Sequence, residues 1–311
     1  MNEENIIYTI GHKSPDTDTV CSAIAYAEYL KSKGKDVVPA RCGEINLETK
    51  YVLEYFGVDC PINLESIKDK KVILVDYNEA SQSSEGLEDA KIMGVIDHHK
   101  IGFSSSEPVN FEIKPYGATA TIIAEKMLED KSFEITKPVA GILISSILSD
   151  TVVFKSTTTT DKDIEVVNEL NKIANIEDIK KFGIEIKKKK SSLIGLSPEK
   201  IIYSDFKNFD VNDIKFGIGQ IEVVDLSEAR EMRNSLLEKL EEISQKDNLL
   251  FTILMVTDII NEGSELLFSK NYSSIEKVFN KQIIDNTVYI EKMMSRKKDL
   301  VPLIMNQLEN K

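Results

Sequence analysis

The sequence contains no tryptophan, only three cysteines, and no apolar run of the roughly 18–20 residues that a membrane-spanning helix needs. Cys21, Cys42 and Cys60 form no CxxC pair, so we expect reduced thiols and neither a zinc site nor a disulfide framework. The first residues, MNEENIIYTIG, lack the basic region and long apolar core of a signal peptide. These absences predict a cytoplasmic protein with no membrane partner.

Positive charge is also scarce. The chain has 39 Lys and Arg against 52 Asp and Glu, and its formal net charge is −13. Because such a chain repels polyanions, we expect no nucleic-acid partner, and an anionic substrate would need local cations or bound metal ions. The 311 residues are enough for two ordinary domains with hydrophobic cores.

Short β-branched runs alternate with helical patterns over the first 100 residues. The runs that we expect to form strands are 6–10, 36–40, 71–76 and 92–97. The segments that we expect to form helices are 19–33, 47–56, 117–130 and 138–148. The hydroxyl-rich segment 156–163, STTTTDKD, is typical of a capped helix start. This order predicts an α/β fold with a doubly wound parallel sheet.

The lysine run KKKKSS, residues 187–192, is the strongest change in composition, and we interpret it as a solvated linker. We therefore expect a first domain of residues 1–188, a linker or hinge of residues 189–194, and a smaller α/β domain of residues 195–311. In the second domain we expect strands at 215–224, 249–257 and 266–269, and helices at 227–244 and near both ends of 272–309.

All three histidines of the chain stand beside aspartates near predicted strand ends. His12 opens the pattern H-x-x-x-D-x-D with Asp16 and Asp18, while His98 and His99 follow Asp97. A single histidine is more often structural than functional. Three purely structural histidines would rarely all lie beside aspartates at strand ends, so we interpret the three as parts of one site.

Parallel strands place their carboxyl ends at one edge of a sheet, where ligands bind. Four loops are expected to bring together His12, Asp16, Asp18, Asp76, Asp97, His98, His99 and Asp150. So many carboxylates repel one another unless cations neutralise them, and these motifs contain no cluster of Arg or Lys. Aspartate and imidazole ligands without thiolates favour manganese, cobalt or magnesium over structural zinc. Two such ions could hold a bridging hydroxide and a phosphoryl group.

These motifs resemble those of a known family. H-x-x-x-D-x-D, a strand-terminal Asp and Asp-His-His form the pattern of the DHH phosphoesterase superfamily. The segments GHKSPDTDTVCSAIAYAEYL, LVDYNEASQS, IDHHK, ISSILSDTVVFKS, SDFKNF and SRKKDLVP, in this order, are similar to those of the family II (manganese-dependent) inorganic pyrophosphatases. The resemblance extends from residue 5 to about 305, and implies a DHH domain followed by a DHHA2-like domain.

The resemblance implies a role for each matching residue. It implies that His12, Asp16 and Asp76 bind one Mn²⁺ ion, with Co²⁺ as a possible substitute. The second ion would be bound by Asp18, Asp76, His98 and Asp150, so that Asp76 bridges the two. Asp97 would orient the histidines. His99, Lys207, Arg296 and Lys297 would bind substrate, with His99 as proton donor and Mg²⁺ arriving with the pyrophosphate.

The resemblance thus implies hydrolysis of pyrophosphate to two phosphates by a metal-activated bridging hydroxide, with the second domain closing over the first. It also implies a homodimer formed through the first domain. One departure is Tyr77, where the family commonly has histidine, and it predicts a changed metal preference. Two alternatives remain: another DHH phosphodiesterase, disfavoured because no histidine follows residue 99, and a metal- or phosphate-binding protein without activity.

Overall fold

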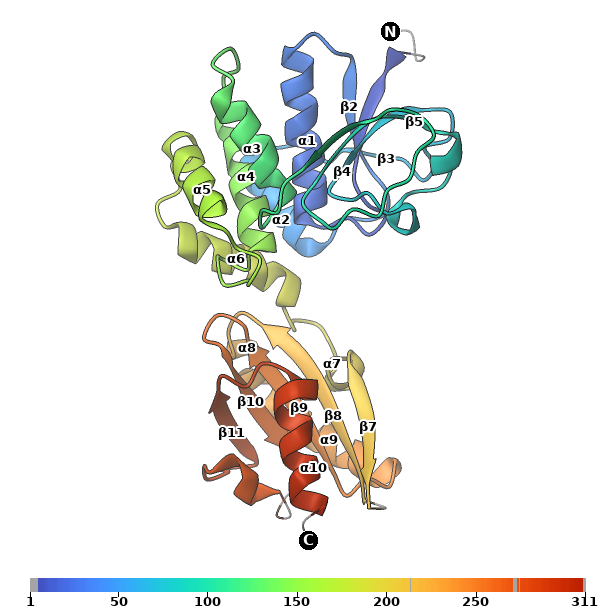
Figure 1. Ribbon diagram of the computed structural model, residues 1–311. Helices are drawn as coiled ribbons and strands as arrows, with labels where there is room; N and C mark the ends of the chain where they lie inside the picture. The colour runs from blue at the N-terminus through green and yellow to red at the C-terminus, as the bar shows by residue number, and fades with distance from the viewer. Residues whose placement is uncertain (1–4, 213, 271–272, 274, 310–311) are drawn as a thin grey trace. The chain divides into compact units, whose positions relative to one another are not determined.

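The chain forms two compact units, Met1–Lys190 and Ser191–Lys311, in a computed structural model that describes residues 5–212, 214–270, 273 and 275–309 (Figure 1). Each unit has a β-sheet of its own. The predicted fold class, a larger α/β domain followed by a smaller one, is confirmed. Within the described ranges, no helix is both long and apolar enough to cross a membrane.

The sheet of the first unit has six parallel strands in the order β3-β2-β1-β4-β5-β6. Its strands are β1 (Ile7–Ile10), β2 (Val37–Arg41), β3 (Ile62–Asn63), β4 (Lys71–Val75), β5 (Lys91–Asp97) and β6 (Asn110–Ile113). The four predicted strands are confirmed. The edge strands β3 and β6 were not predicted, because they are short and lack a continuous apolar run.

The helices of the first unit are α1 (Thr17–Ser32), α2 (Leu47–Phe56), α3 (Thr119–Glu129), α4 (Lys137–Asp150), α5 (Asp161–Ala174) and α6 (Ile179–Ser191). Helix α1 begins two residues before the predicted start because the Asp16 side chain caps it, accepting a hydrogen bond from the Thr19 N–H. The capped start at 156–163 is confirmed, since Thr160 and Asp163 form a capping box at the start of α5.

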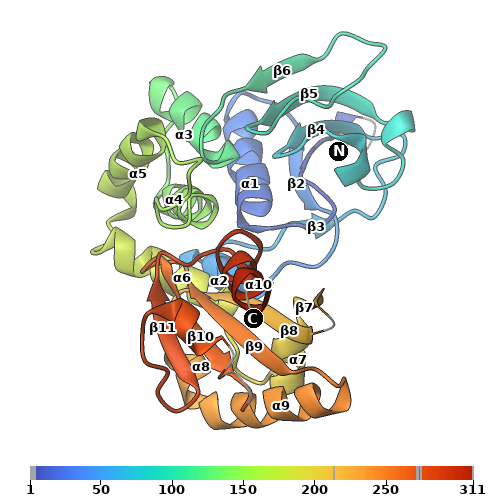
Figure 2. The same cartoon turned by 60° about the horizontal axis from the view of Figure 1, so that its bottom comes forward.

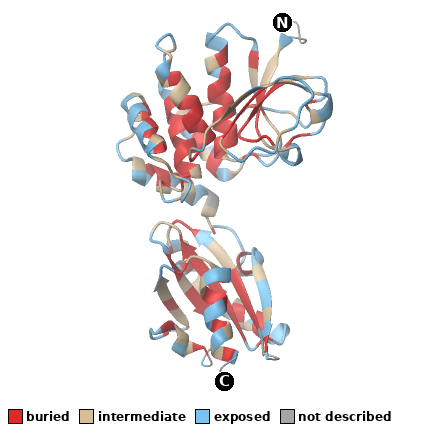
Figure 3. Ribbon diagram, viewed as in Figure 1, coloured by how far each residue is buried: buried red, intermediate tan, exposed pale blue. Residues whose placement is uncertain are grey.

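The two faces of this sheet are covered differently. Helices α1, α3 and α4 gather on one side of it, and α4 is buried along most of its length (Figures 1, 2 and 3). The crossovers from β3 to β6 contain no α-helix; they contain loops and the short 3₁₀ turns η2 (Ala80–Gln82) and η3 (Leu87–Asp89). Their apolar residues form a cluster with strand residues such as Ile10, Leu74 and Val95.

The lysine run does not form the predicted linker. Residues 187–190 belong to α6, which continues to Ser191, although the sequence predicts a linker over 189–194. The reason is that lysine is a good helix former and that the first lysine of the run has a buried partner, Glu48. The irregular stretch at the start of the second unit begins after Ser191.

The second unit has a mixed five-stranded sheet in the order β11-β10-β9-β8-β7, in which only the β8–β9 pair is parallel. Its strands are β7 (Phe206–Val211), β8 (Ile214–Val223), β9 (Phe251–Asp258), β10 (Gly263–Phe268) and β11 (Thr287–Glu291). Strand β9 is buried throughout, and its alternate side chains enter two separate cores: Ile253 packs in one and Leu254 in the other. β7 and β11 were not predicted.

Helices cover both faces of this sheet. They are α7 (Pro198–Tyr203), α8 (Ser227–Glu231), α9 (Arg233–Lys246), the 3₁₀ turn η4 (Glu276–Phe279), the π-helical turn η5 (Arg296–Leu300) and α10 (Val301–Glu309). The helix predicted over 227–244 is divided at Met232 into α8 and α9. The helix predicted at the end of the chain is confirmed by α10. The one predicted near residue 272 falls partly on residues 271, 272 and 274, which lie outside the described ranges, and the described residues after them contain η4.

Candidate metal centre

The structure brings the predicted metal ligands to the carboxyl edge of the first sheet. His12 follows β1, Asp76 follows β4, and His98 follows β5. Asp150 arrives differently from the expectation of four loops, because it is the last residue of helix α4. A carboxylate at the C-terminal end of a helix meets the negative end of the helix dipole, so this position favours a cationic partner.

Among the described residues, three groups of side chains meet closely enough to hold a metal ion, and Asp76 belongs to each. Within each group the candidate ligand atoms lie within 4.8 Å of one another. His12 Nε2 is 3.6 Å from Asp16 Oδ2 and 3.7 Å from Asp76 Oδ2. His98 Nε2 is 3.5 Å from Asp76 Oδ1 and 3.6 Å from Asp150 Oδ2. The groups are His12, Asp16 and Asp76; Asp18, Asp76, His98 and Asp150; and Asp76, His98 and His99.

Asp76 is the most constrained of these carboxylates. It is buried, and its φ of 66° lies in the left-handed region that costs energy for a residue with a side chain. Its two oxygens accept hydrogen bonds from the hydroxyls of Thr19 (2.7 Å) and Thr119 (2.8 Å). Burial, followed by the charges of Asp18 and Asp16, raises its pKa well above the ordinary value. A bound cation would remove that conflict.

Asp18 is held by neutral donors from helices α1, α3 and α4. The N–H groups of Thr119 and Ala120 donate to its two oxygens at 2.7 and 3.0 Å. The hydroxyls of Ser22 and Ser146 also donate to it, at 2.9 and 2.6 Å. The first turn of α3 therefore fixes the orientation of a carboxylate that lies at the start of α1.

His98 provides the clearest sign that a cation fits here. Its Nδ1 lies 2.9 Å from the carbonyl oxygen of Tyr116, to which it can only donate. In the neutral imidazole the other ring nitrogen, Nε2, then carries the lone pair, and this atom is buried with no hydrogen-bond partner in the described structure. An unpartnered buried acceptor that faces Asp76 and Asp150 suits a metal ion, so the donor set fits the divalent cations predicted.

Asp97 contacts both histidines, but it binds the ring of His99 and only the backbone of His98, whose ring is oriented by the Tyr116 carbonyl. Its Oδ1 accepts the backbone N–H of His98 (2.7 Å) and the Nδ1–H of His99 (2.8 Å), while Asn78 donates to Oδ2 at 2.5 Å. The bond to Asp97 raises the pKa of His99. Burial alone would raise the pKa of Asp97, but the hydrogen bonds from His99 and Asn78 lower it overall. The side chain of His99 is half exposed.

The cavity at these ligands has a volume of about 250 Å³. Besides His12, Asp16, His99 and Asp150, four residues line it that sequence reasoning missed: Lys13, Ser14, Ser81 and Gln82. Ser14 and Lys13 lie inside the H-x-x-x-D-x-D motif, so their position within it was a usable signal. Ser81 and Gln82 lie in η2, which only the folded chain brings close, through a hydrogen bond from the Lys13 N–H to the Gln82 carbonyl.

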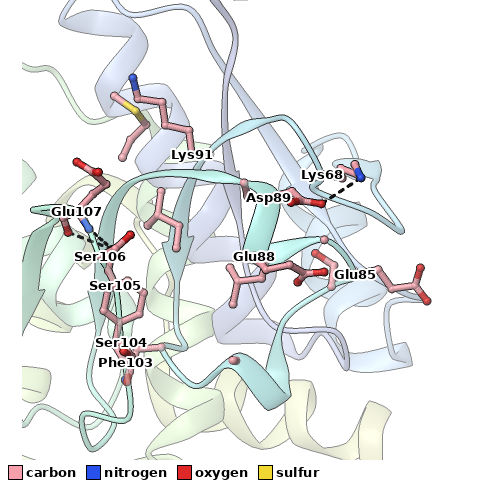
Figure 4. Close-up of a pocket in the computed structure, with 18 of the residues that line it drawn as sticks. Lys68, Glu85, Glu88, Asp89, Lys91, Phe103, Ser104, Ser105, Ser106 and Glu107 are labelled. Atoms are coloured by element: carbon pink, nitrogen blue, oxygen red, sulfur yellow. Dashed lines mark hydrogen bonds and ion pairs between the residues drawn. The ribbon is translucent and has the colours of Figure 1, made fainter.

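A larger cavity of about 1200 Å³ lies elsewhere in the first unit (Figure 4). It is lined by the loops around Glu85–Lys91 and Gly102–Pro108, and Lys68 forms an ion pair with Asp89 there at 3.0 Å. None of the predicted metal ligands is among its described lining residues. We therefore place the chemistry at the smaller cavity.

The predicted substrate-binding cations lie in the second unit. Lys207 is exposed on β7, and Lys297 is exposed in the π-helical turn η5. The loop before η5 is fixed by Gln220, which sequence reasoning missed. Its side-chain amide donates to the Met294 carbonyl and accepts the Arg296 N–H, both at 3.2 Å.

Arg296 is placed differently from the other two cations. Its side chain is 6% exposed, and its Nη2 lies 2.8 and 2.9 Å from the two carboxylate oxygens of Asp205. Its Nη1 donates to the carbonyl oxygens of Asp205 and Ile218. The guanidinium therefore already has ionic and backbone partners within its own unit, which sequence reasoning could not foresee.

Tyr77 does not lie where the sequence suggests. Its side chain is completely buried in the apolar cluster that contains Ile10, Leu74 and Val95, and its hydroxyl lies 3.2 Å from that of Ser83. The ring thus packs under the loops that cover the sheet. This position gives no support to the expected effect on metal preference.

This chain is similar to known proteins over nearly its whole length. The family models "DHH family, N-terminal domain" and "DHHA2 domain" match residues 6–147 and 184–307. Manganese-dependent inorganic pyrophosphatases from Methanocaldococcus jannaschii and Methanothrix thermoacetophila are each 47% identical to this chain, over 95% of it and over 97% and 96% of their own lengths.

A solved structure from Methanococcus jannaschii, described as a family II inorganic pyrophosphatase, is 46% identical. The match covers 97% of this chain and 99% of that one, with a TM-score of 0.63. Identity at this level over nearly the full length of each relative is far above what a shared fold alone would give. The chain belongs to the family of manganese-dependent inorganic pyrophosphatases.

Proposed function

We propose that this protein hydrolyses inorganic pyrophosphate to two phosphates at a centre of two Mn²⁺ ions. The observation that carries the proposal is the sharing of Asp76 by two ligand groups on its two sides. His12 Nε2 lies 3.7 Å from Asp76 Oδ2 and 3.6 Å from Asp16, whereas His98 Nε2 lies 3.5 Å from Asp76 Oδ1. One carboxylate with a separate set of partners at each oxygen is the arrangement that a bridging ligand requires.

The proposed ligands of one ion are His12, Asp16 and Asp76, and those of the other are Asp18, Asp76, His98 and Asp150. When bound, such ions lower the pKa of a water that they share and neutralise charge on phosphoryl oxygens. Cobalt could replace manganese because the donor set is the same, and magnesium would accompany the substrate.

His99 is the proposed proton donor to the leaving phosphate. The imidazole lines the cavity and is half exposed, so it can reach a ligand there. Its pKa is raised by the hydrogen bond to Asp97, which keeps the ring protonated to a higher pH than a free histidine. A ring that keeps its proton to higher pH suits the role of proton donor to a departing phosphate.

The substrate needs more positive charge than the first unit supplies. Lys13 is the only Lys or Arg among the described residues that line the cavity. We propose that Lys207, Arg296 and Lys297 of the second unit provide the rest, with closure of the second unit over the first. Lys207 and Lys297 are exposed and ready for this role, whereas Arg296 would have to exchange Asp205 for phosphate oxygens.

The test is phosphate release from pyrophosphate by metal-depleted protein, with metal content measured in parallel. We expect no turnover after chelation, and better recovery with Mn²⁺ or Co²⁺ than with Zn²⁺. Asp76→Ala should reduce turnover to below a few per cent and bound manganese to less than two ions per chain. Full activity in metal-free buffer, or two tightly bound ions in Asp76→Ala, would contradict the proposal.

Assembly and compartment remain predictions. We propose a cytoplasmic homodimer formed through the first unit, on the basis of the family to which the chain belongs. Light scattering at micromolar protein concentration would test the assembly, and a monomeric mass would refute it.

A further inference from the structure

Asp163 is a buried carboxylate that the proposed chemistry does not use. It lies at the third position of α5 and is completely inaccessible to solvent. Its capping role accounts for two bonds, from the N–H and hydroxyl of Thr160, both at 2.7 Å. Burying a charged group for a helix cap alone would be costly, since the Thr160 hydroxyl already caps this helix.

The remaining bonds of Asp163 reach a different part of the chain. The Gly117 N–H donates to both carboxylate oxygens, at 3.1 and 3.0 Å, and the Thr121 hydroxyl donates at 2.5 Å. A Cβ atom at Gly117 would lie 2.7 Å from Asp163 Oδ2, so this close approach requires glycine there. Asp163 therefore holds the start of α3 at two points, on either side of Thr119.

The segment that Asp163 holds touches three proposed metal ligands. The Tyr116 carbonyl accepts His98 Nδ1, and the Thr119 hydroxyl donates to Asp76. The N–H groups of Thr119 and Ala120 donate to Asp18. All of these bonds lie between Tyr116 and Ala120, next to or between the two points that Asp163 fixes.

We propose that Asp163 is a positioning residue for one of the two metal sites. It fixes residues 116–121, which orient Asp18, Asp76 and His98. Of the two proposed metal sites, Asp18 and His98 belong only to the one that Asp150 completes, and none of the bonds reaches His12 or Asp16. Loss of Asp163 should therefore weaken the Asp18–Asp76–His98–Asp150 site more than the His12–Asp16–Asp76 site. The inference rests on the proposed metal centre.

The test is a titration of metal-depleted protein with Mn²⁺, in which binding is measured by calorimetry or by the electron paramagnetic resonance signal of free Mn²⁺. The melting temperature of each metal-free protein is measured in parallel. Asp163→Asn preserves the size of the side chain, but its amide N–H₂ group would face the N–H and hydroxyl donors that the carboxylate now accepts. We expect one Mn²⁺ site to keep nearly the wild-type affinity and the other to weaken by roughly 10–100-fold, the usual effect of losing a group that orients a ligand.

Asn171→Ala is the matched control, because Asn171 stabilises the opposite end of the same helix through bonds to Ile176. It should lower the melting temperature and leave both affinities unchanged. Thr121→Val is a milder variant that removes one donor to Asp163 and keeps the capping box, and it should weaken the same site by a smaller factor.

Wild-type affinity at both sites in Asp163→Asn and Thr121→Val would overturn the inference. So would an equal loss at both sites, which would indicate general destabilisation. Wild-type protein that binds no manganese would refute the metal centre itself, and this outcome is distinguishable from the other two.

Discussion

Arg296 and Asp205 form an ion pair that the proposed substrate would have to displace. One guanidinium nitrogen, Nη2, contacts both carboxylate oxygens of Asp205, whose side chain is 53% exposed. Phosphate oxygens accept charge-assisted hydrogen bonds from the same kind of donor. The carboxylate therefore occupies the donors that the proposed reaction requires. If Arg296 binds substrate, it does so by exchanging one anion for another.

This competition gives a prediction for Asp205→Asn. The amide is a weaker partner for the guanidinium, so we expect a lower KM for pyrophosphate together with a modest loss of thermal stability. Arg296→Ala should lower both kcat and kcat/KM, by about 3–4 kcal/mol of transition-state stabilisation. Steady-state kinetics at saturating Mn²⁺ measures both. If Asp205→Asn changes only the melting temperature, Arg296 has a structural role and does not bind substrate.

Tyr77 permits a second prediction at the scale of one residue. Tyr77→His would place a smaller, more polar ring in an apolar cluster, and should cost roughly 2–4 kcal/mol of stability. Because the ring packs away from the carboxylates, manganese affinity should change by less than about threefold, well below the roughly 10–100-fold expected of a group that orients a ligand. Denaturant unfolding and metal titration separate the effects. A large change in affinity would show that the family histidine acts on the metals.

At the scale of one element, helix α6 illustrates how a charged run can become part of a core. Lys187 is only 12% exposed, and its Nζ lies 3.3 Å from the buried Glu48 Oε2 and 3.3 Å from the Ser149 carbonyl. Glu48 also accepts hydrogen bonds from Thr17 and Ser149. The end of α6 is therefore tied to helix α4 beside Asp150, and the charge of Lys187 opposes the rise in the pKa of Asp150.

We expect Lys187→Met to destabilise the first unit by about 3–5 kcal/mol, because it leaves the Glu48 carboxylate buried without its cation. Adding Glu48→Gln should recover part of that loss. Lys181→Met, at an exposed position of the same helix, is the control and should change stability by less than about 0.5 kcal/mol. Denaturant unfolding of the metal-free proteins measures all three. Equal effects of Lys187→Met and Lys181→Met would disprove the buried ion pair.

At the scale of the whole molecule, the acidic centre links stability to pH and to metal. Burial and neighbouring carboxylates raise the pKa values of Asp76 and Asp150 well above those in the unfolded chain. Between the unfolded and folded pKa values, the folded metal-free protein binds more protons than the unfolded chain. Its stability therefore falls as the pH rises through that window. Metal ions require the deprotonated carboxylates, so their binding releases protons.

We therefore expect metal-free protein to melt at a lower temperature near pH 8 than near pH 5.5, and Mn²⁺ to raise the melting temperature more at the higher pH. Asp76→Asn removes one of the two titrating carboxylates and should flatten the pH dependence of the metal-free protein. Calorimetry at both pH values, with and without Mn²⁺, provides the measurement. A manganese effect that is independent of pH would contradict this account.

The sequence by itself determined which residues gather at the sheet edge. Asp76 ends a predicted strand, and His12 and His98 each follow one. Parallel strands have their carboxyl ends at one edge whatever packs around them. The family, too, was predictable, because the motifs occur in a fixed order along the chain. These features are local or collinear, so they can be read without knowing any long-range contact.

Only the tertiary structure decided how each side chain is held. Four of these contacts join residues that are far apart in the chain: Arg296 with Asp205, Tyr77 with its apolar cluster, Lys187 with Glu48, and Gly117 with Asp163. The short edge strands β3 and β6 also depend on their neighbours, since neither has the apolar pattern that predicts a strand alone. Hydrogen bonds and ion pairs depend on distances between atoms, and those distances exist only once the chain has folded.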